Sequence, residues 1–236
     1  MSIKPLYIVT LDVLGFKHLI DKRPLDEIVK MYKDLIEIGT PIRFNISKES
    51  SKTNNSAAED IVLEHTVFSD SMIIWTEPTK NNINYFGYFL SLLVGHSIVK
   101  QLPLRFGIAY GECEMDIGAQ MFVGKPIIDA YQTESNQEWI GGAFHKSCYS
   151  APYFELMKGL NFAFLYDVPI KEEKEPKLEF AVNWVCSTFY HDRNLEDLRS
   201  AVIEGADMAK QKHKEKWLNT LNFIDSFSGR SPVETI

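Results

Sequence analysis

A chain of 236 residues, 45% of them hydrophobic, is long enough to bury a substantial core within one domain. Its formal net charge of −7 argues against the broad basic face that duplex nucleic acid requires, so we expect no nucleic-acid partner. A small anionic ligand bound through a metal ion is compatible with this charge. The three widely spaced cysteines indicate neither a disulfide framework nor a paired-cysteine zinc site.

No stretch reaches the roughly 18 consecutive apolar residues that a membrane span requires, so no membrane partner is expected. The N-terminal segment MSIKPLYIVTLDVLGF soon reaches Asp12 and contains no cleavage site. It is therefore interpreted as a first strand rather than a signal peptide. Together these features favour a cytoplasmic protein.

The first predicted element is a strand over residues 6–13, where the nearly continuous apolar run LYIVTLDV is typical of a strand covered on both faces. Asp12 interrupts this run near its end. After Gly15 the apolar residues recur at helical spacing, and Pro24 begins a second helical pattern. The polar residues 47–59 carry no apolar period and predict a loop inside the domain.

A β-hairpin follows, because residues 60–68 and 72–76 are two β-rich runs that flank Asp70. Residues 83–99 predict an apolar helix. Residues 104–114 predict a strand in which Gly107 and Gly111 indicate a bulge or a close backbone approach. The remaining predicted elements are a helix over 124–134, strands over 139–144, 162–168 and 178–185, and helices between 194 and 227.

This order predicts an α+β sandwich in which helices pack on a mixed sheet. We expect the main domain to occupy residues 1–190, with residues 191–236 as a C-terminal helical extension packed on the same domain.

Asp12 and Asp70 are the residues that indicate chemistry. If their strands are neighbours, the two carboxylates form a hard-oxygen site suited to Mg²⁺ or Mn²⁺. Two such ions about 4 Å apart can activate an attacking hydroxyl and clamp phosphoryl oxygens. The Val13 carbonyl could be a further metal ligand, and the backbone N–H groups at Gly15 and Phe16 could face phosphate. Taken singly, each aspartate could instead be a turn former or a helix cap.

Four motifs carry a family resemblance: LDVLGF at 11–16, FSDSMII at 68–74, LRFGIAYGE at 104–112 and FVGKPIIDAY at 122–131. In this order and spacing they resemble the class III nucleotidyl cyclase catalytic domain over roughly residues 5 to 145. The resemblance implies a ferredoxin-like sandwich with a mostly antiparallel sheet. It also implies a head-to-tail homodimer with interfacial active sites.

In that family two divalent ions direct the ribose 3′-hydroxyl of a nucleoside triphosphate onto the α-phosphate. The resemblance assigns the metal-ligand positions to Asp12, Asp70 and the Val13 backbone. It assigns a catalytic position to Arg105, which matches the family's strand arginine.

The base-reading positions depart from the purine cyclases. Adenylate forms carry Lys and Asp, and guanylate forms Glu and Cys, where this chain has Thr66 and Met121. The FSDS hairpin, the RxGIAYGE strand and the AYxxE helix are more similar to bacterial pyrimidine cyclases, which make cyclic CMP or cyclic UMP in anti-phage signalling. The expected reaction therefore converts UTP or CTP to a 3′,5′-cyclic monophosphate and pyrophosphate.

The transition-state Asn and Arg of the family align with Ile128 and Gln132, and neither carries charge. One interpretation is that another cation substitutes, with Arg105, Lys125, Lys17 and Arg43 as candidates; Lys125 would then contact substrate. The alternative is a non-catalytic module that binds nucleotide or dimerises. A diguanylate-cyclase-like palm would need a GG[DE]EF hairpin, which FSDSM does not match.

Overall fold

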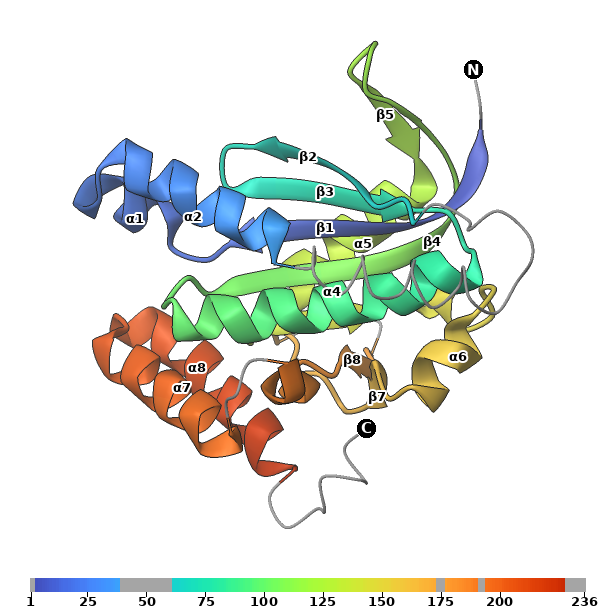
Figure 1. The fold of residues 1–236 in the computed structure, drawn as a ribbon. Helices are drawn as coiled ribbons and strands as arrows, with labels where there is room; N and C mark the ends of the chain where they lie inside the picture. Colours follow the sequence, from blue (N-terminus) through green and yellow to red (C-terminus); the bar gives the residue numbers. More distant parts are fainter. Residues whose placement is uncertain (1–2, 39–60, 173–176, 191–193, 228–236) are drawn as a thin grey trace.

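A computed structural model describes residues 3–38, 61–172, 177–190 and 194–227 (Figure 1). The loop predicted over 47–59 and the candidate Arg43 lie outside these residues. The strands are β1 (Lys4–Val13), β2 (Glu64–Phe68), β3 (Ser71–Thr76), β4 (Leu104–Asp116), β5 (Met121–Gly124), β6 (Gly141–Phe144), β7 (Ala163–Leu165) and β8 (Phe180–Val182). The α-helices are α1 (Phe16–Lys22), α2 (Leu25–Glu37), α4 (Lys80–Val99), α5 (Lys125–Asn136), α6 (Phe154–Gly159), α7 (Leu195–Met208) and α8 (Gln211–Asp225). Two short 3₁₀ helices are η1 (Lys146–Cys148) and η2 (Val185–Tyr190).

The described strands form one sheet in the order β2-β3-β1-β4-β6-β8-β7, and β5 pairs with the end of β4. The pairing of β4 with β6 is parallel, and the other pairings among these strands are antiparallel. This is the mixed, mostly antiparallel α+β architecture that we expected. The strand that carries Asp12 lies near the centre of the sheet, between β3 and β4.

Helices cover both faces of this sheet, with α4 on one face and α5 on the other (Figure 1). The alternation along β1 explains this, because Tyr7 and Val9 belong to the larger core with α4 while Leu6 and Ile8 belong to a smaller core with α5. A strand buried on both faces is what the continuous apolar run predicts. Asp12 follows the alternation of Leu6 and Ile8, so it belongs to the α5 face.

The C-terminal helices share the main core. Thr220 of α8 accepts a hydrogen bond from the Ile140 amide at 2.8 Å, and the fully buried Phe223 packs edge-on against Trp139. The described part of the helical extension therefore shares the main hydrophobic core. The domain boundary at residue 190 stays a prediction.

Gly107 sets the distance between β4 and α5. A Cβ atom at this position would lie 2.1 Å from the Ala130 carbonyl oxygen and 2.6 Å from the Glu134 backbone nitrogen. Only glycine allows this approach, which confirms the close contact that the sequence predicted. The contact places Glu134 over the start of β4, close to Arg105.

Some elements differ from the expectation. Helix α5 begins at Lys125 rather than Gly124, because residues 121–124 extend as β5 and pair with β4. Phe122 of β5 packs against Trp75 with ring centroids 5.8 Å apart. The local sequence pattern does not predict this tertiary contact. Helix α6 has six residues, too few to show a helical period. Within the described ranges, no helix is long and apolar enough to cross a membrane.

Candidate active site

The structure brings Asp12 and Asp70 to the same end of neighbouring strands. Asp12 is the last but one residue of β1 and pairs in register with Ser71, the residue that follows Asp70 in the turn between β2 and β3. The Val13 amide donates a hydrogen bond to the Asp70 carbonyl at 3.1 Å and ties the hairpin tip to the end of β1. The meeting of the two acids, which the sequence made conditional on strand order, is observed.

The two carboxylates share an electrostatically unfavourable position. Burial raises the pKa of Asp12, and the charge of Asp70 raises it further, while Arg105 and Lys171 oppose this. The Asp12 side chain keeps 30% exposure, so a solute can reach it. Among the described residues, none donates a hydrogen bond to either carboxylate, so their oxygens are open to a hard cation that would relieve the repulsion.

Two turns with left-handed backbone geometry shape this end of the sheet. Ser69 has φ 58°, which reverses the hairpin just before Asp70 and is uncommon for a residue other than glycine. Gly15, the residue just before α1, has φ 78°. Since a Cβ there would meet no atom within 4 Å, the backbone angle rather than crowding favours glycine. Contact of Gly15 and Phe16 with phosphate stays a prediction.

Arg105 is buried and most of its donors are engaged. Its Nε and Nη2 atoms lie 2.7 and 2.6 Å from Glu134 Oε1, and its Nη1 donates to the Gln137 carbonyl at 3.0 Å. Its Nη2 lies 3.9 Å from Asp12 Oδ2, an ion pair beyond hydrogen-bond distance. Arg105 therefore acts on Asp12 as a neighbouring charge, held in place by Glu134.

Sequence reasoning missed Lys171. Its ammonium donates to the Ser135 carbonyl and its amide to the Asn136 carbonyl, so it lies at the end of α5. Its charge lowers the pKa of Asp12, and burial lowers the pKa of Lys171 itself. Lys171 belongs to no motif, and its approach to Asp12 depends on a tertiary fold that sequence spacing does not reveal.

Tyr32 lies on the buried face of α2, and sequence reasoning assigns it no role in the site. Its hydroxyl is buried, and both Asp70 and Asp12 add to the effect of burial in raising the pKa of Tyr32. The single signal in the sequence was the residue type, since tyrosine brings a polar end to an apolar face.

The other predicted substrate residues, Thr66, Met121 and Lys125, lie on elements that do not carry Asp12 or Asp70. Thr66 is half-buried on β2 opposite Ile73, and Met121 is half-buried at the start of β5. Lys125 is 78% exposed, and its ammonium pairs with the Asp129 carboxylate at 2.5 Å. These three residues therefore lie on β2, β5 and α5, while Asp12 lies near the end of β1 and Asp70 lies in the turn between β2 and β3.

Lys125 and Asp129 belong to a groove of about 510 Å³ between α5 and the segment after β6. The groove also contains His145, whose Nδ1 lies 3.8 Å from Asp129 Oδ2. Burial lowers the pKa of His145, which favours its neutral form. The outer side of α5 presents Ile128 and Gln132 to solvent.

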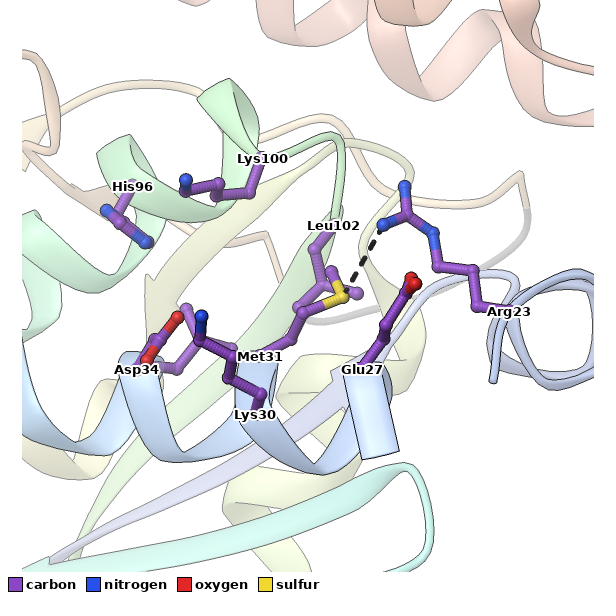
Figure 2. A pocket seen from close by; sticks show the side chains of 9 residues that line it. Arg23, Glu27, Lys30, Met31, Asp34, His96, Lys100 and Leu102 are labelled. Carbon is purple, nitrogen blue, oxygen red and sulfur yellow. Dashed lines mark hydrogen bonds between the residues drawn. The ribbon is translucent and has the colours of Figure 1, made fainter. Parts of the chain in front are cut away.

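A second hollow of about 240 Å³ lies between α2 and the end of α4 (Figure 2). Basic and acidic side chains face one another there, and Arg23 Nη1 lies 3.8 Å from the Met31 sulfur. Its lining consists of Arg23, Glu27, Lys30, Met31, Asp34, Leu35, His96, Lys100 and Leu102. None of the residues predicted for metal or substrate belongs to it.

No family model and no curated protein matches this chain. Among solved structures, it is similar to the adenylyl cyclase CyaB from P. aeruginosa, at 15% identity and TM-score 0.47 over 77% of this chain and 94% of that one. It is similar to a bacterial light-regulated adenylyl cyclase, at 14% identity and TM-score 0.46 over 87% and 100%. It is also similar to the guanylate cyclase domain of RhGC from Catenaria anguillulae in complex with GTP, at 13% identity and TM-score 0.43 over 76% and 96%. At identities and TM-scores this low, we infer no activity from these likenesses.

Proposed function

We propose that this chain is a metal-dependent nucleotidyl cyclase that converts UTP or CTP to the 3′,5′-cyclic monophosphate and pyrophosphate. The observation that carries the proposal is the pair of carboxylates, Asp12 and Asp70, side by side and without hydrogen-bond donors among the described residues. In the reaction the ribose 3′-oxygen bonds to the α-phosphorus. The bond from that phosphorus to the pyrophosphate oxygen breaks, and the 3′-hydroxyl proton is released.

The donor atoms fit Mg²⁺ or Mn²⁺, which prefer carboxylate oxygens. Among the described residues, no group of three or more His, Cys, Asp or Glu side chains could hold a metal ion by itself. Asp12, Asp70 and the Val13 carbonyl would therefore share the ions with phosphate oxygens and water. When bound, such ions neutralise charge on the triphosphate and make the attacking hydroxyl more acidic.

Among the residues that the structure describes, Arg105 and Lys171 are the cations whose charges lower the pKa of Asp12. They are favoured over Lys125, which is paired with Asp129. Arg105 is held by Glu134, so we assign it the role of orienting Asp12 and moderating its charge. Lys171 is then the candidate for the cation that Ile128 and Gln132 do not supply.

We place the active site at a homodimer interface. Supporting this, apolar side chains are exposed on β2, β5 and α5: Phe68 is 84% exposed, Val123 60%, Ile128 57% and Tyr131 61%. Thr66 and Met121 would contact the base, and Lys125 the substrate, across this interface. A cytoplasmic role in bacterial antiviral signalling belongs to the same proposal, on the strength of the FSDSMII and LRFGIAYGE motifs.

The test is to incubate the full chain with each of the four nucleoside triphosphates and Mn²⁺, and to separate the products by chromatography. We expect a cyclic pyrimidine monophosphate from the wild type and none from Asp70→Ala. A matched control is Asp167→Asn, which removes an exposed acid paired with Lys177 and should keep full activity. Four intact triphosphates, beside an active control cyclase, would contradict the proposal.

A specific observation favours a second candidate, a nucleotide-binding module without turnover. Ile128 and Gln132 carry no charge, and the guanidinium of Arg105 is engaged by Glu134. Loss of a charged transition-state donor commonly costs several kcal/mol of barrier. This candidate predicts that triphosphate binds with Mn²⁺ and is recovered intact.

A further inference from the structure

The Tyr32 hydroxyl is a buried donor without an acceptor. Tyr32 is 9% exposed, and its ring packs edge-on against Phe16 with centroids 6.2 Å apart. Within the described part of the chain, its hydroxyl has no hydrogen-bond partner. A buried, unsatisfied polar group costs about 1–3 kcal/mol, so phenylalanine would suit this position better if packing were its purpose. Tyr7 shows the ordinary arrangement, because its hydroxyl donates to the Pro152 carbonyl at 2.9 Å.

Two carboxylates of the proposed metal site, Asp70 and Asp12, act electrostatically on this hydroxyl. After burial, the charge of Asp70 and then that of Asp12 raise the pKa of Tyr32, so its hydroxyl is within electrostatic reach of both. Neither carboxylate accepts a hydrogen bond from a described residue. The unpartnered Tyr32 hydroxyl is therefore within electrostatic reach of two carboxylates that have no hydrogen-bond donor among the described residues.

The connection through Phe16 places Tyr32 next to the chain segment that follows Asp12. Phe16 is the first residue of α1, which the chain enters through the left-handed turn at Gly15. A ligand that orders this turn would also fix the ring on which Tyr32 packs. The Tyr32 ring is thus packed against the residue that ends the turn after Asp12.

We propose that Tyr32 is a positioning residue of the metal site, whose hydroxyl donates a hydrogen bond to the Asp70 carboxylate when a divalent cation is bound. The inference rests on the metal site of the proposed function. Carboxylates that bind metal are themselves usually hydrogen-bonded, and this second interaction fixes their orientation. Loss of such an outer hydrogen bond typically weakens metal binding by about 10–100-fold.

The experiment measures Mn²⁺ binding to the full chain from the electron paramagnetic resonance signal of the free aqua ion, without nucleotide. The proteins are the wild type, Asp70→Asn, Tyr32→Phe and the control Tyr7→Phe. We expect Asp70→Asn to lose the binding, Tyr32→Phe to weaken it by about 10-fold or more, and Tyr7→Phe to bind as the wild type does.

Thermal unfolding without metal gives the second readout. Tyr32→Phe should be as stable as the wild type or more stable, because it removes an unsatisfied group. Tyr7→Phe should be less stable, because it removes a satisfied hydrogen bond. In turnover, Tyr32→Phe should need more Mn²⁺ for half-maximal rate and should recover near wild-type rate at saturating Mn²⁺.

Equal Mn²⁺ affinity of Tyr32→Phe and the wild type would overturn the inference while leaving the Asp70 site intact. A loss of metal-free stability in Tyr32→Phe as large as that in Tyr7→Phe would overturn it too, since the hydroxyl would then have a structural partner. Mn²⁺ binding that does not depend on Asp70 would overturn both the inference and the metal site. Asp70-dependent binding without turnover would overturn the cyclase activity alone.

Discussion

Replacing Gly107 by alanine tests whether the close contact of β4 with α5 holds the site together. The added Cβ would lie 2.1 Å from the Ala130 carbonyl oxygen, and this obstacle is backbone, so α5 has to move. Overpacking of this kind costs about 1–3 kcal/mol, and the rigid obstacle favours the upper end. For a chain of this size, about 3 kcal/mol corresponds to a fall in Tm of roughly 6–12 °C.

The same displacement moves Glu134 away from Arg105, to which it is bound at 2.6 Å. Since a misplacement of about 1 Å can reduce a rate by about 10²-fold, we expect turnover to fall together with stability. The matched control is Gly111→Ala on the same strand, where the Cβ would meet Pro126 at 3.5 Å, an ordinary contact.

The assays are thermal unfolding and the initial rate of product formation. Gly111→Ala should remain within about 1 kcal/mol of the wild type, because the loss of backbone freedom in the unfolded chain offsets small adjustments. If Gly107→Ala matched Gly111→Ala in both Tm and rate, the reasoning from the β4 and α5 contact would be refuted.

Two further predictions concern the charge of Asp12 and the outer face of α5. Burial raises the pKa of Asp12 in the folded protein above its ordinary value of 3.8, so ionising this carboxyl destabilises the folded state. The free energy of unfolding is therefore highest while Asp12 is protonated at low pH, and it falls as pH rises through the folded pKa. Asp12→Asn should therefore be more stable than the wild type at pH 7 and equal to it at pH 3, while losing activity; lower stability of Asp12→Asn at pH 7 would contradict this. Ile128→Glu should shift sedimentation from dimer to monomer, whereas Leu165→Glu, an exposed residue on β7, should not; an unchanged dimer in Ile128→Glu would exclude this face as the interface.

The sequence singles out the two acids of the candidate site because each interrupts an apolar run. A carboxylate near the end of a buried strand, and another at a hairpin tip, are visible as breaks in hydrophobic patterns. Their meeting required β1 and β3 to be neighbours, a condition that the sequence left open and the register of Asp12 with Ser71 fulfils. Gly107 was visible for the same reason, as a glycine inside a strand.

The surroundings of the acids were not predictable in this way. Arg105 and Glu134 lie on different elements, and their bond depends on how closely α5 approaches β4. Lys171 is held at the end of α5 by backbone carbonyls, and its charge acts on Asp12 from there. Contacts of this kind leave no pattern in the sequence. Tyr32 occupies a buried position of α2, as an apolar residue would. Only the structure shows that its hydroxyl has no hydrogen-bond partner among the described residues.

We propose above all that Asp12 and Asp70 support metal-dependent cyclisation. The most direct measurement quantifies cyclic monophosphate and pyrophosphate together, from UTP and from CTP, with Mn²⁺ and with excess EDTA, for the wild type and Asp70→Asn. We predict that the wild type forms the two products in equal amounts from one pyrimidine triphosphate, and that EDTA and Asp70→Asn each abolish both. Release of nucleoside diphosphate and phosphate, or undiminished product from Asp70→Asn, would contradict the claim.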